Sequence, residues 1–338
     1  MTDITISGNN RYLLPGTYTE FDRVTFTGTR GRDTLFAGGG EGEAYFGATP
    51  GNDLYGIADH PSANYWPGSI ADYSGAHSAI NADLEKPGGT RTFVDERGVS
   101  HTVTIIGTST DGFGGVDVFA AHPASFITGS SIDTVIGSRF GDTIKASNAF
   151  GGAGNDRMTG FSLLGEEGDD WLETSGGGAL GGSGNDRLLS RVAGVLYGET
   201  GNDCLRGDFG DDFMEGGTGK DVLASGAGND TINPDDEYLL PAPGDGVRDV
   251  ILVTKADLGA FTDTVAFFED GIDQIRFRDA VKGGLDFRIT KVPDPNESAT
   301  TDTLLQIDQN RDGTYDANDY SLYVYDSDLS LHRGYLLT

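Results

Sequence analysis

The sequence is poor in cysteine and in basic residues. A single cysteine, Cys204, rules out a disulfide within the chain, and an exposed free thiol is the simplest interpretation. Lysine and arginine together number 23 against 53 acidic residues, which gives a net charge of −30. Proteins that bind nucleic acids neutralise phosphates with basic side chains, so this acidity argues against a nucleic-acid partner.

Long apolar runs are also missing from the sequence. No run is long enough to span a membrane. The N-terminal sequence MTDITISGNNRYLL has no basic region followed by an apolar stretch, so we expect no ordinary signal peptide.

Several catalytic motifs do not occur. A zinc protease of the H-E-x-x-H type needs two histidines one helical turn apart beside a glutamate, and this pattern is absent. The sequence also has no G-x-S-x-G, no cysteine nucleophile with partners and no Gly-Lys phosphate loop. The five histidines have no ligand spacing. A pair of acids could still serve a glycosidase, but the turns described next account for most of the aspartates.

Glycine and a short repeat dominate the chain instead. Between Gly198 and Asn233 a nine-residue pattern occurs four times without a break, as GETGNDCLR, GDFGDDFME, GGTGKDVLA and SGAGNDTIN. Glycine takes the fourth place, aspartate the sixth and an apolar residue the eighth. A fixed short period predicts stacked coils rather than a globular core. The eighth-place residues should point inward and form a narrow core: Leu205, Met214, Leu223 and Ile232.

Each copy predicts a turn followed by a short strand. Glycine permits the positive φ of a sharp turn, and the sixth-place aspartate directs a carboxylate into it. Two copies form one coil, so Asp203 should lie beside Asp221 on one side of the stack. On the other side Asp212 should lie beside Asp230. A plain β-helix with aspartates that only hydrogen-bond in turns is the alternative. Stacked carboxylates repel one another unless a cation lies between them, and Ca²⁺ favours several oxygen ligands.

The pattern continues upstream with uneven spacing. GGAGNDRMT begins at Gly151, GEEGDDWLE at Gly165 and GGSGNDRLL at Gly181, and a weaker copy, GSRFGDTIK, begins at Gly137. The half-repeats between them lack acids, which predicts an asymmetric stack with calcium on the second side only near Asp212 and Asp230. The first side carries an aspartate in every coil: Asp142, Asp156, Asp170, Asp186, Asp203 and Asp221.

These nonapeptides resemble the calcium-binding repeats of RTX proteins, which have the pattern G-G-x-G-x-D-x-U-x. The resemblance implies an all-β fold: a right-handed parallel β-roll, or β-solenoid, with several calcium ions in its turns and a C-terminal β-rich cap. By motif position, the implied calcium-site residues of the roll are Asp142, Gly151, Gly154, Asp156, Gly165, Gly168, Asp170, Gly181, Gly184, Asp186, Gly198, Gly201, Asp203, Gly207, Gly210, Asp212, Gly216, Gly219, Asp221, Gly228 and Asp230.

The resemblance also implies a location. RTX proteins are generally exported by type I secretion machinery that reads an uncleaved C-terminal signal, so we expect a secreted, extracellular protein. Cytoplasmic calcium is too scarce to fill weak oxygen sites, which agrees with this location. Self-repulsion at a net charge of −30 predicts a chain that is largely disordered without calcium and folded with it.

Less regular segments flank the repeats. GTRGRDTLF and ATPGNDLYG contain Asp33 and Asp53, and Glu43 of GGGEGEAYF lies between them at a spacing of ten residues, which predicts a wider coil and one calcium ion shared by Asp33 and Asp53. Segments 72–84 and 126–142 resemble R-modules of mannuronan C5-epimerases, and LEKPGGTRTFVDERGVSH between them is expected to be a solvated loop. The predicted regions are 1–60, irregular coils; 61–136, an R-module-like β segment; 137–233, the calcium roll; and 234–338, a β cap with the secretion region.

The C-terminal region alternates apolar and polar residues from residue 248 onward, which predicts strands and resembles the cap of serralysin-type proteases. Five residues should point inward and close the stack: Val250, Ile251, Phe267, Ile272 and Ile275. Further on, DQNRDGTYDAND has acids at EF-hand spacing, but its flanks alternate like strands and favour a β-hairpin. Calcium in this turn stays an open prediction, with ligands among Asp308, Asn310, Asp312, Asp316 and Asp319.

One outward-facing row could bind a ligand. The seventh-place residues Arg157, Trp171 and Arg187 should stack about 4.8 Å apart on the outside of successive coils. A tryptophan flanked by arginines suits a sugar ring with carboxylates, although the N-terminal segment or the cap could cover this face. Three functions stay open: a non-catalytic secreted protein of the cell surface or matrix, a polysaccharide-modifying enzyme (epimerase- or lyase-like) or its accessory module with catalytic acids in 1–135, and an adhesin-like binder of acidic polysaccharide.

Overall fold

The computed structural model describes residues 2–7, 11–13, 22–37, 43–47, 49–57, 69–85, 88–94, 100–114, 116–121, 134–235, 244–278, 287–293, 301–309, 311–325 and 336–337. Within these ranges the chain is all-β, with strands β1 to β29 and no helix. The described part accordingly holds no helix with the length and apolarity needed to cross a membrane. Internal contacts divide the chain into two units, Met1–Gly160 and Phe161–Thr338, and each is described separately.

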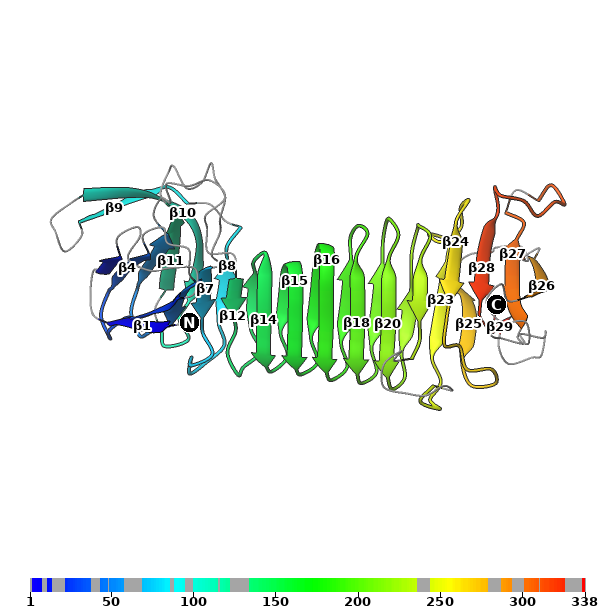
Figure 1. Cartoon of the computed structure of the whole chain (residues 1–338), viewed down its shortest axis with the longest axis horizontal. Helices are drawn as coiled ribbons and strands as arrows, with labels where there is room; N and C mark the ends of the chain where they lie inside the picture. The colour runs from blue at the N-terminus through cyan, green and yellow to red at the C-terminus, as the bar shows by residue number, and fades with distance from the viewer. Residues whose placement is uncertain are drawn as a thin grey trace. The chain divides into compact units, whose positions relative to one another are not determined.

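In the second unit, short parallel strands lie side by side in two stacks (Figure 1). Stack A runs through β16 (Trp171–Ser183), β17 (Arg187–Ser190), β19 (Cys204–Gly207), β21 (Val222–Ala224), β23 (Val250–Thr254) and β25 (Gln274–Arg278). Stack B runs through the second half of β16, then β18 (Val195–Thr200), β20 (Phe213–Thr218), β22 (Thr231–Asn233) and β24 (Thr262–Val265). The chain alternates between the stacks, which confirms the predicted β-roll.

The register of the strands reflects the repeat. Cys204 pairs with Val222 in stack A and Phe213 pairs with Thr231 in stack B, so one coil takes 18 residues. Eighth-place side chains from both stacks fill the space between them and are at most 1 % exposed: Leu172, Leu188, Leu205, Met214, Leu223 and Ile232. The narrow core predicted from the repeat is confirmed.

Parallel pairing continues past the last repeat. β23 pairs with β25 in stack A, and β24 pairs with β28 (Tyr320–Val324) in stack B. Val250, Ile251 and Ile275 are buried, as expected for residues that extend the core. The expectation for Phe267 is wrong: its side chain is 41 % exposed, because the residue lies in the turn after β24 with φ at 57°. Ile272 is only half-buried.

Antiparallel pairing appears near the C-terminal end. β26 (Phe287–Pro293) pairs with β27 (Thr301–Ile307), and β27 pairs with β28. β27 and β28 flank the acidic turn that begins at Asp308, which confirms a β-hairpin in place of EF-hand helices. Asn310 lies outside the described residues.

Wider coils form the first unit. Thr34 of β4 (Thr34–Ala37) pairs with Leu54 of β6 (Leu54–Ile57), a step of 20 residues, as the ten-residue spacing predicts. β6 pairs in turn with β11 (Val116–Ala121). A second row runs from β1 (Thr2–Ser7) through β3 (Asp22–Thr27), β5 (Glu43–Gly47), β7 (Ser69–Asp72) and β12 (Thr134–Ile136) to β14 (Asn148–Ala153). Aromatic rings stack between coils, with centroids 5.0 Å apart for Phe26 and Phe46.

A hairpin projects from these coils where a solvated loop was expected. β9 (Thr90–Val94) pairs antiparallel with β10 (Ser100–Thr110), so the prediction of a loop over residues 84–101 is wrong for 90–94 and 100–101. The stretch TRTFV contains β-branched and aromatic residues that favour strands, and β10 supplies its partner. β10 also pairs with β8 (Asn81–Asp83) and β11. β8 pairs in parallel with β13 (Thr143–Lys145), which pairs with β15 (Arg157–Glu167).

Candidate calcium sites

Aspartates of the second unit form hydrogen-bonded rows along the roll, and those within the nonapeptides occupy the sixth place of the repeat. The backbone N–H of each aspartate donates to Oδ1 of the aspartate one coil further on. Row A consists of Asp170, Asp186, Asp203, Asp221, Asp249 and Asp273, with N···Oδ1 distances of 2.7 Å, and 3.0 Å for the last step. Row B consists of Asp212, Asp230 and Asp263, with distances of 2.8 Å and 3.0 Å. Row B starts where Gly194 donates to Asp212, so one side carries more aspartates than the other.

In six of these carboxylates the second oxygen has no donor among the described residues. In the part of the chain that the structure describes, Oδ2 is buried without a hydrogen-bond partner in Asp186, Asp203, Asp212, Asp221, Asp230 and Asp249. Buried polar atoms are normally satisfied, because leaving one unpaired costs free energy. A row of unsatisfied anionic oxygens therefore indicates a cation that binds them.

Glycine at the first place of the repeat keeps space beside these oxygens. A Cβ atom on Gly198 would lie 2.5 Å from Oδ2 of Asp203 and closer still to the carbonyl oxygen of Gly216, one coil away. The carboxylate oxygen and the main-chain oxygen therefore converge on one point. The same pairing of an Oδ2 atom with a carbonyl oxygen occurs at the other first-place glycines, Gly165, Gly181, Gly207 and Gly216.

Fourth-place glycines shape the turns. Their φ angles are positive, a conformation that favours glycine, at Gly154, Gly168, Gly184, Gly201, Gly210 and Gly219. At Gly228 a Cβ atom would meet the carbonyl oxygen of Gly210 in the preceding coil. The repeat therefore needs glycine wherever backbones of adjacent coils come together.

The pKa values of the aspartates in rows A and B also favour a bound cation. Burial, with a contribution from neighbouring carboxylates, raises the pKa of Asp186, Asp212 and Asp221 to about 7. Burial likewise raises the pKa of Asp249 to about 9, and the charges of Asp221 and Asp273 add to it. Carboxylate and carbonyl oxygens are the ligands that Ca²⁺ prefers, so the residues present fit this ion.

Stacked turns lined by such oxygens define the second unit as a calcium-binding parallel β-roll. The family model of the RTX calcium-binding nonapeptide repeat matches the chain at residues 25–41 and 195–233, in 4 copies. The chain thus contains RTX calcium-binding repeats, and such repeats bind Ca²⁺ in several turns. No curated protein matches the sequence.

Asp33 and Asp53 of the first unit accept hydrogen bonds from protein donors instead. The N–H of Asp33 donates to Oδ1 of Asp53 at 2.7 Å, while Oδ2 of Asp53 accepts from the hydroxyls of Tyr55 and Thr49, both at 3.1 Å. The backbone N–H of Thr29 donates to Oδ2 of Asp33. The shared calcium ion predicted for Asp33 and Asp53 stays a prediction, and these donors compete with it.

Asp142 is satisfied in a similar way. Its Oδ1 accepts from the N–H of Ile80 at 2.7 Å, and its Oδ2 accepts from the N–H of Ser138 at 2.5 Å. The N–H of Asp142 donates to Oδ1 of Asp156 at 2.6 Å, so the hydrogen-bond pattern of the rows is present here as well. The carbonyl oxygen of Gly151 lies beside Oδ2 of Asp142, at the position that a Cβ atom on Gly137 would occupy.

In the hairpin turn only part of the EF-hand-like set comes together. Oδ2 of Asp308 accepts from the N–H of Gly313 at 2.9 Å, and its buried Oδ1 has no donor among the described residues. Asp319 accepts from the N–H of Asp316 at 3.2 Å. Asp312 is exposed and accepts from the N–H of its neighbour Thr314. Calcium in this turn remains a prediction.

The outward-facing pair Trp171 and Arg187 does meet. The two residues are paired across β16 and β17, and the guanidinium carbon of Arg187 lies 5.4 Å from the centroid of the Trp171 ring. Trp171 is 40 % exposed. Arg157 is exposed in the first unit, opposite Thr143. Cys204 follows Arg187 in stack A and is an exposed free thiol, as expected.

Sequence reasoning missed the row members outside the nonapeptides. Asp249, Asp263 and Asp273 extend the rows, and Asp117 takes the same role after Asp53 in the first unit. A signal for them exists in the sequence. Each precedes a buried apolar residue by two places, in DVI, DTV, DQI and DVF, which is the relation between the sixth and eighth places of the repeat.

Proposed function

We propose that this protein folds into its roll when calcium binds outside the cell, and that it acts there, without catalysis of its own, at the cell surface or in the extracellular matrix. The observation that carries the proposal is the row of buried carboxylate oxygens without donors. Without a cation their burial is costly, and at a net charge of −30 the whole chain also repels itself. The free energy of calcium binding then becomes free energy of folding.

An extracellular place of action agrees with the chemistry of these sites. Oxygen sites of moderate affinity fill at extracellular calcium levels and stay empty in the cytoplasm. Export through type I secretion machinery is consistent with the resemblance to RTX proteins.

Circular dichroism with and without a calcium chelator tests the folding step. We expect the β signal to disappear on chelation and to return cooperatively as calcium is titrated back. A β signal unchanged by chelation would sink the proposal. Production beside a type I secretion system, followed by detection of the chain in the medium, tests the export step.

The non-catalytic assignment has support in the N-terminal coils. In the described part of 2–121 the buried carboxylates are Asp33, Asp53, Asp111 and Asp117, and each accepts a backbone N–H. These contacts suit aspartates that hold turns. The alternative, a polysaccharide-modifying enzyme, predicts turnover of an acidic polysaccharide by the calcium-loaded chain, and a screen for new reducing or unsaturated ends detects it.

A role in binding an acidic polysaccharide is supported by a separate observation, the exposed Trp171 beside Arg187. The ring can stack on a sugar, and the guanidinium can pair with the carboxylate of a uronic acid. Retention on an immobilised polyuronate should fall for Trp171→Ala. It should not change for Phe209→Ala, which removes an aromatic ring that is 69 % exposed elsewhere in the second unit. Equal retention of both variants and the parent chain would rule this role out.

A further inference from the structure

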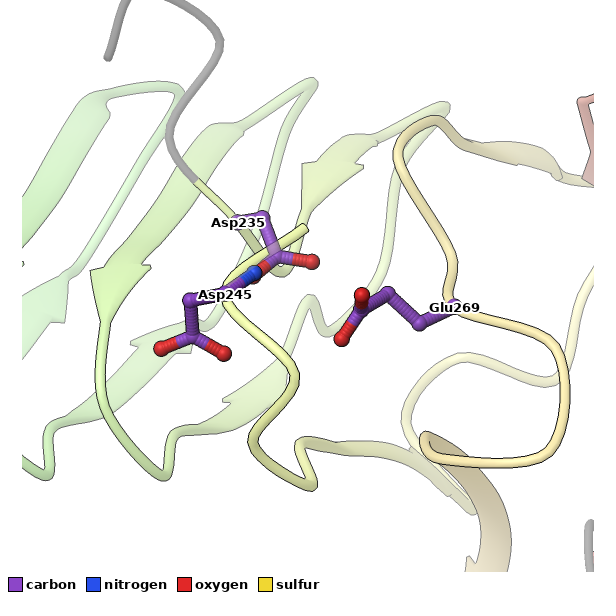
Figure 2. A group of neighbouring side chains, drawn as sticks. All are labelled: Asp235, Asp245 and Glu269. Atoms are coloured by element: carbon purple, nitrogen blue, oxygen red, sulfur yellow. The ribbon is translucent and has the colours of Figure 1, made fainter. Parts of the chain in front are cut away.

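Beyond the repeats, acidic side chains converge where the last nonapeptide meets the coils that follow. They come from three separate segments: Asp235 just after β22, Asp245 and Asp249 before β23, and Glu269 and Asp273 between β24 and β25. Figure 2 shows Glu269 extending from its turn toward Asp235 and Asp245. We propose that this group, named here the Asp235 cluster, binds calcium and fastens the following coils to the last repeat.

The geometry of the Asp235 cluster suits a metal ion. One oxygen each from Asp235, Asp245 and Glu269 lies within 4.8 Å of the others. A second set at the same spacing joins Asp235 to Asp249 and Asp273. Oxygens at such separations can surround one cation, and Asp235 belongs to both sets.

Unsatisfied buried oxygens point to a ligand at this place. Asp235 is 1 % exposed and Asp249 is 0 % exposed, and the Oδ2 atoms of both have no hydrogen-bond partner among the described residues. Their other oxygens are already used, since Oδ1 of Asp235 accepts the N–H of Asp245 at 3.0 Å and Oδ1 of Asp249 accepts the N–H of Asp221 at 2.7 Å. Oδ2 of Asp235 and Oδ2 of Asp249 are therefore the two buried anionic oxygens of the Asp235 cluster that still lack a hydrogen-bond donor in the described part of the chain.

Among the described residues, no lysine or arginine side chain forms an ion pair with the carboxylates of the Asp235 cluster. The described ion pairs involve Lys145, Arg191 and Arg206 instead. Buried charges are normally paired with a counter-charge or bound to a metal. Since every side-chain ligand here is a carboxylate, a hard oxygen-binding cation fits, and calcium is the ion that the adjacent repeats bind.

The backbone at Gly244 and Gly246 helps to place the Glu269 carboxylate beside Asp235 and Asp245. A Cβ atom on Gly244 would overlap the carboxyl carbon of Glu269, so glycine at this position leaves room for the Glu269 side chain as it is placed. The N–H of Gly246 donates to Oε2 of Glu269 at 3.0 Å and holds the carboxylate in place. Glu269 is itself 7 % exposed, so water does not solvate it freely.

A bound ion would link three parts of the chain. The last repeat coil supplies Asp235, the next coil supplies Asp245 and Asp249, and the coil after that supplies Glu269 and Asp273. Because the intervening sequence spacing is irregular, no nonapeptide pattern marks this site. Calcium would stabilise this end of the roll by holding the three segments together.

Calcium counting on the full-length chain tests the site. Equilibrium dialysis against radioactive calcium should show that Glu269→Gln and Asp235→Asn each bind about one ion fewer than the parent chain. Asp270→Asn is the matched control, because Asp270 is the exposed neighbour of Glu269 and belongs to neither set. Glu269→Gln keeps the shape of the side chain, and circular dichroism checks that each variant retains its β signal in calcium.

The results separate this site from the repeats. A loss confined to Glu269→Gln and Asp235→Asn supports the Asp235 cluster, and so does a variant that stays unfolded at calcium concentrations that fold Asp270→Asn. Calcium counts equal to the parent count in both cluster variants would overturn the site while leaving calcium-driven folding intact. A parent chain that binds no calcium would overturn both.

Discussion

The backbone N–H of Asp203 donates to Oδ1 of Asp221, one coil further on, at 2.7 Å, while Oδ2 of Asp221 is buried without a donor. One carboxylate oxygen therefore connects adjacent turns, and the other is left for a cation. The same arrangement occurs at Asp186, Asp203, Asp212, Asp230 and Asp249.

Replacing Asp221 by asparagine should remove a calcium ligand and keep the hydrogen bond from Asp203. Thermal unfolding in saturating calcium should show a loss of about 2.7 kcal/mol per lost ion when free calcium is about 100 times the dissociation constant. The difference should shrink as free calcium falls toward the dissociation constant, since the ion then stabilises the parent chain less. Asp211→Asn, an exposed acid in the second unit, is the control and should unfold like the parent chain.

Gly198→Ala should close the space beside Asp203. The new methyl group would meet Oδ2 of Asp203 and the carbonyl oxygen of Gly216, so we expect a loss of calcium affinity and of about 1–3 kcal/mol of stability. Gly178→Ala provides the comparison, because a Cβ atom there meets only the carbonyl oxygen of Val195, at 3.8 Å. Equal calcium titrations of the two variants would contradict this account of the first-place glycine.

Acidification should partly replace calcium. Burial raises the pKa of Asp186, Asp212 and Asp221 from 3.8 to about 7 in the cation-free roll, so their ionisation opposes folding. This cost is absent below the unfolded pKa of about 4 and grows as pH rises to about 7. Chelated protein should therefore gain β signal as pH falls toward about 4, whereas calcium affinity should increase with pH up to about 7. Calcium titrations that coincide at pH values of about 5.5 and 8 would be incompatible with this coupling.

Tyr320→Phe should destabilise the protein by the same amount at every calcium concentration that folds it. The Tyr320 hydroxyl donates to Oδ2 of Asp263 at 2.8 Å, so a protein donor fills the oxygen that is left open in Asp212 and Asp230. Removing that donor leaves Oδ2 of Asp263 with the hydroxyl of Ser225 alone, at 3.2 Å, and this hydroxyl can also donate to Asp257, so we expect a cost of about 1 kcal/mol. Urea unfolding at two calcium concentrations that both fold the parent chain measures the loss, with the exposed Tyr325→Phe as control. A loss that changes with the calcium concentration would mean that Asp263 ligates the ion.

Local sequence patterns were sufficient to predict the β-roll. The relation of Asp203 to Leu205 repeats every nine residues, and a turn followed by a strand needs only neighbouring residues to form. Stacking then follows, because each coil buries its apolar side chain only against the next coil. The 18-residue coil, the buried eighth places and the unequal rows were therefore readable in advance.

Irregular segments were harder to predict because their partners are distant in sequence. The stretch 90–94 looked like part of a loop until β10 paired with it. Phe267 fits an alternating pattern, yet it lies in a turn. In a turn, alternation does not determine whether a side chain points into the core or toward solvent. In both cases an apolar pattern shows that burial or pairing is possible, and the neighbouring strand decides whether it happens.

The sequence by itself determined that the chain stacks in coils and binds calcium, since glycine, aspartate and an apolar residue at fixed intervals specify the turn, the ligand and the core together. Only the tertiary structure decided which carboxylates have an oxygen left for an ion. Asp53 and Asp263 accept tyrosine hydroxyls, whereas Asp203 does not, and Asp235 meets Glu269 only because three separate segments fold to one place. The availability of an oxygen depends on every donor around it, and those donors come from positions that no repeat specifies.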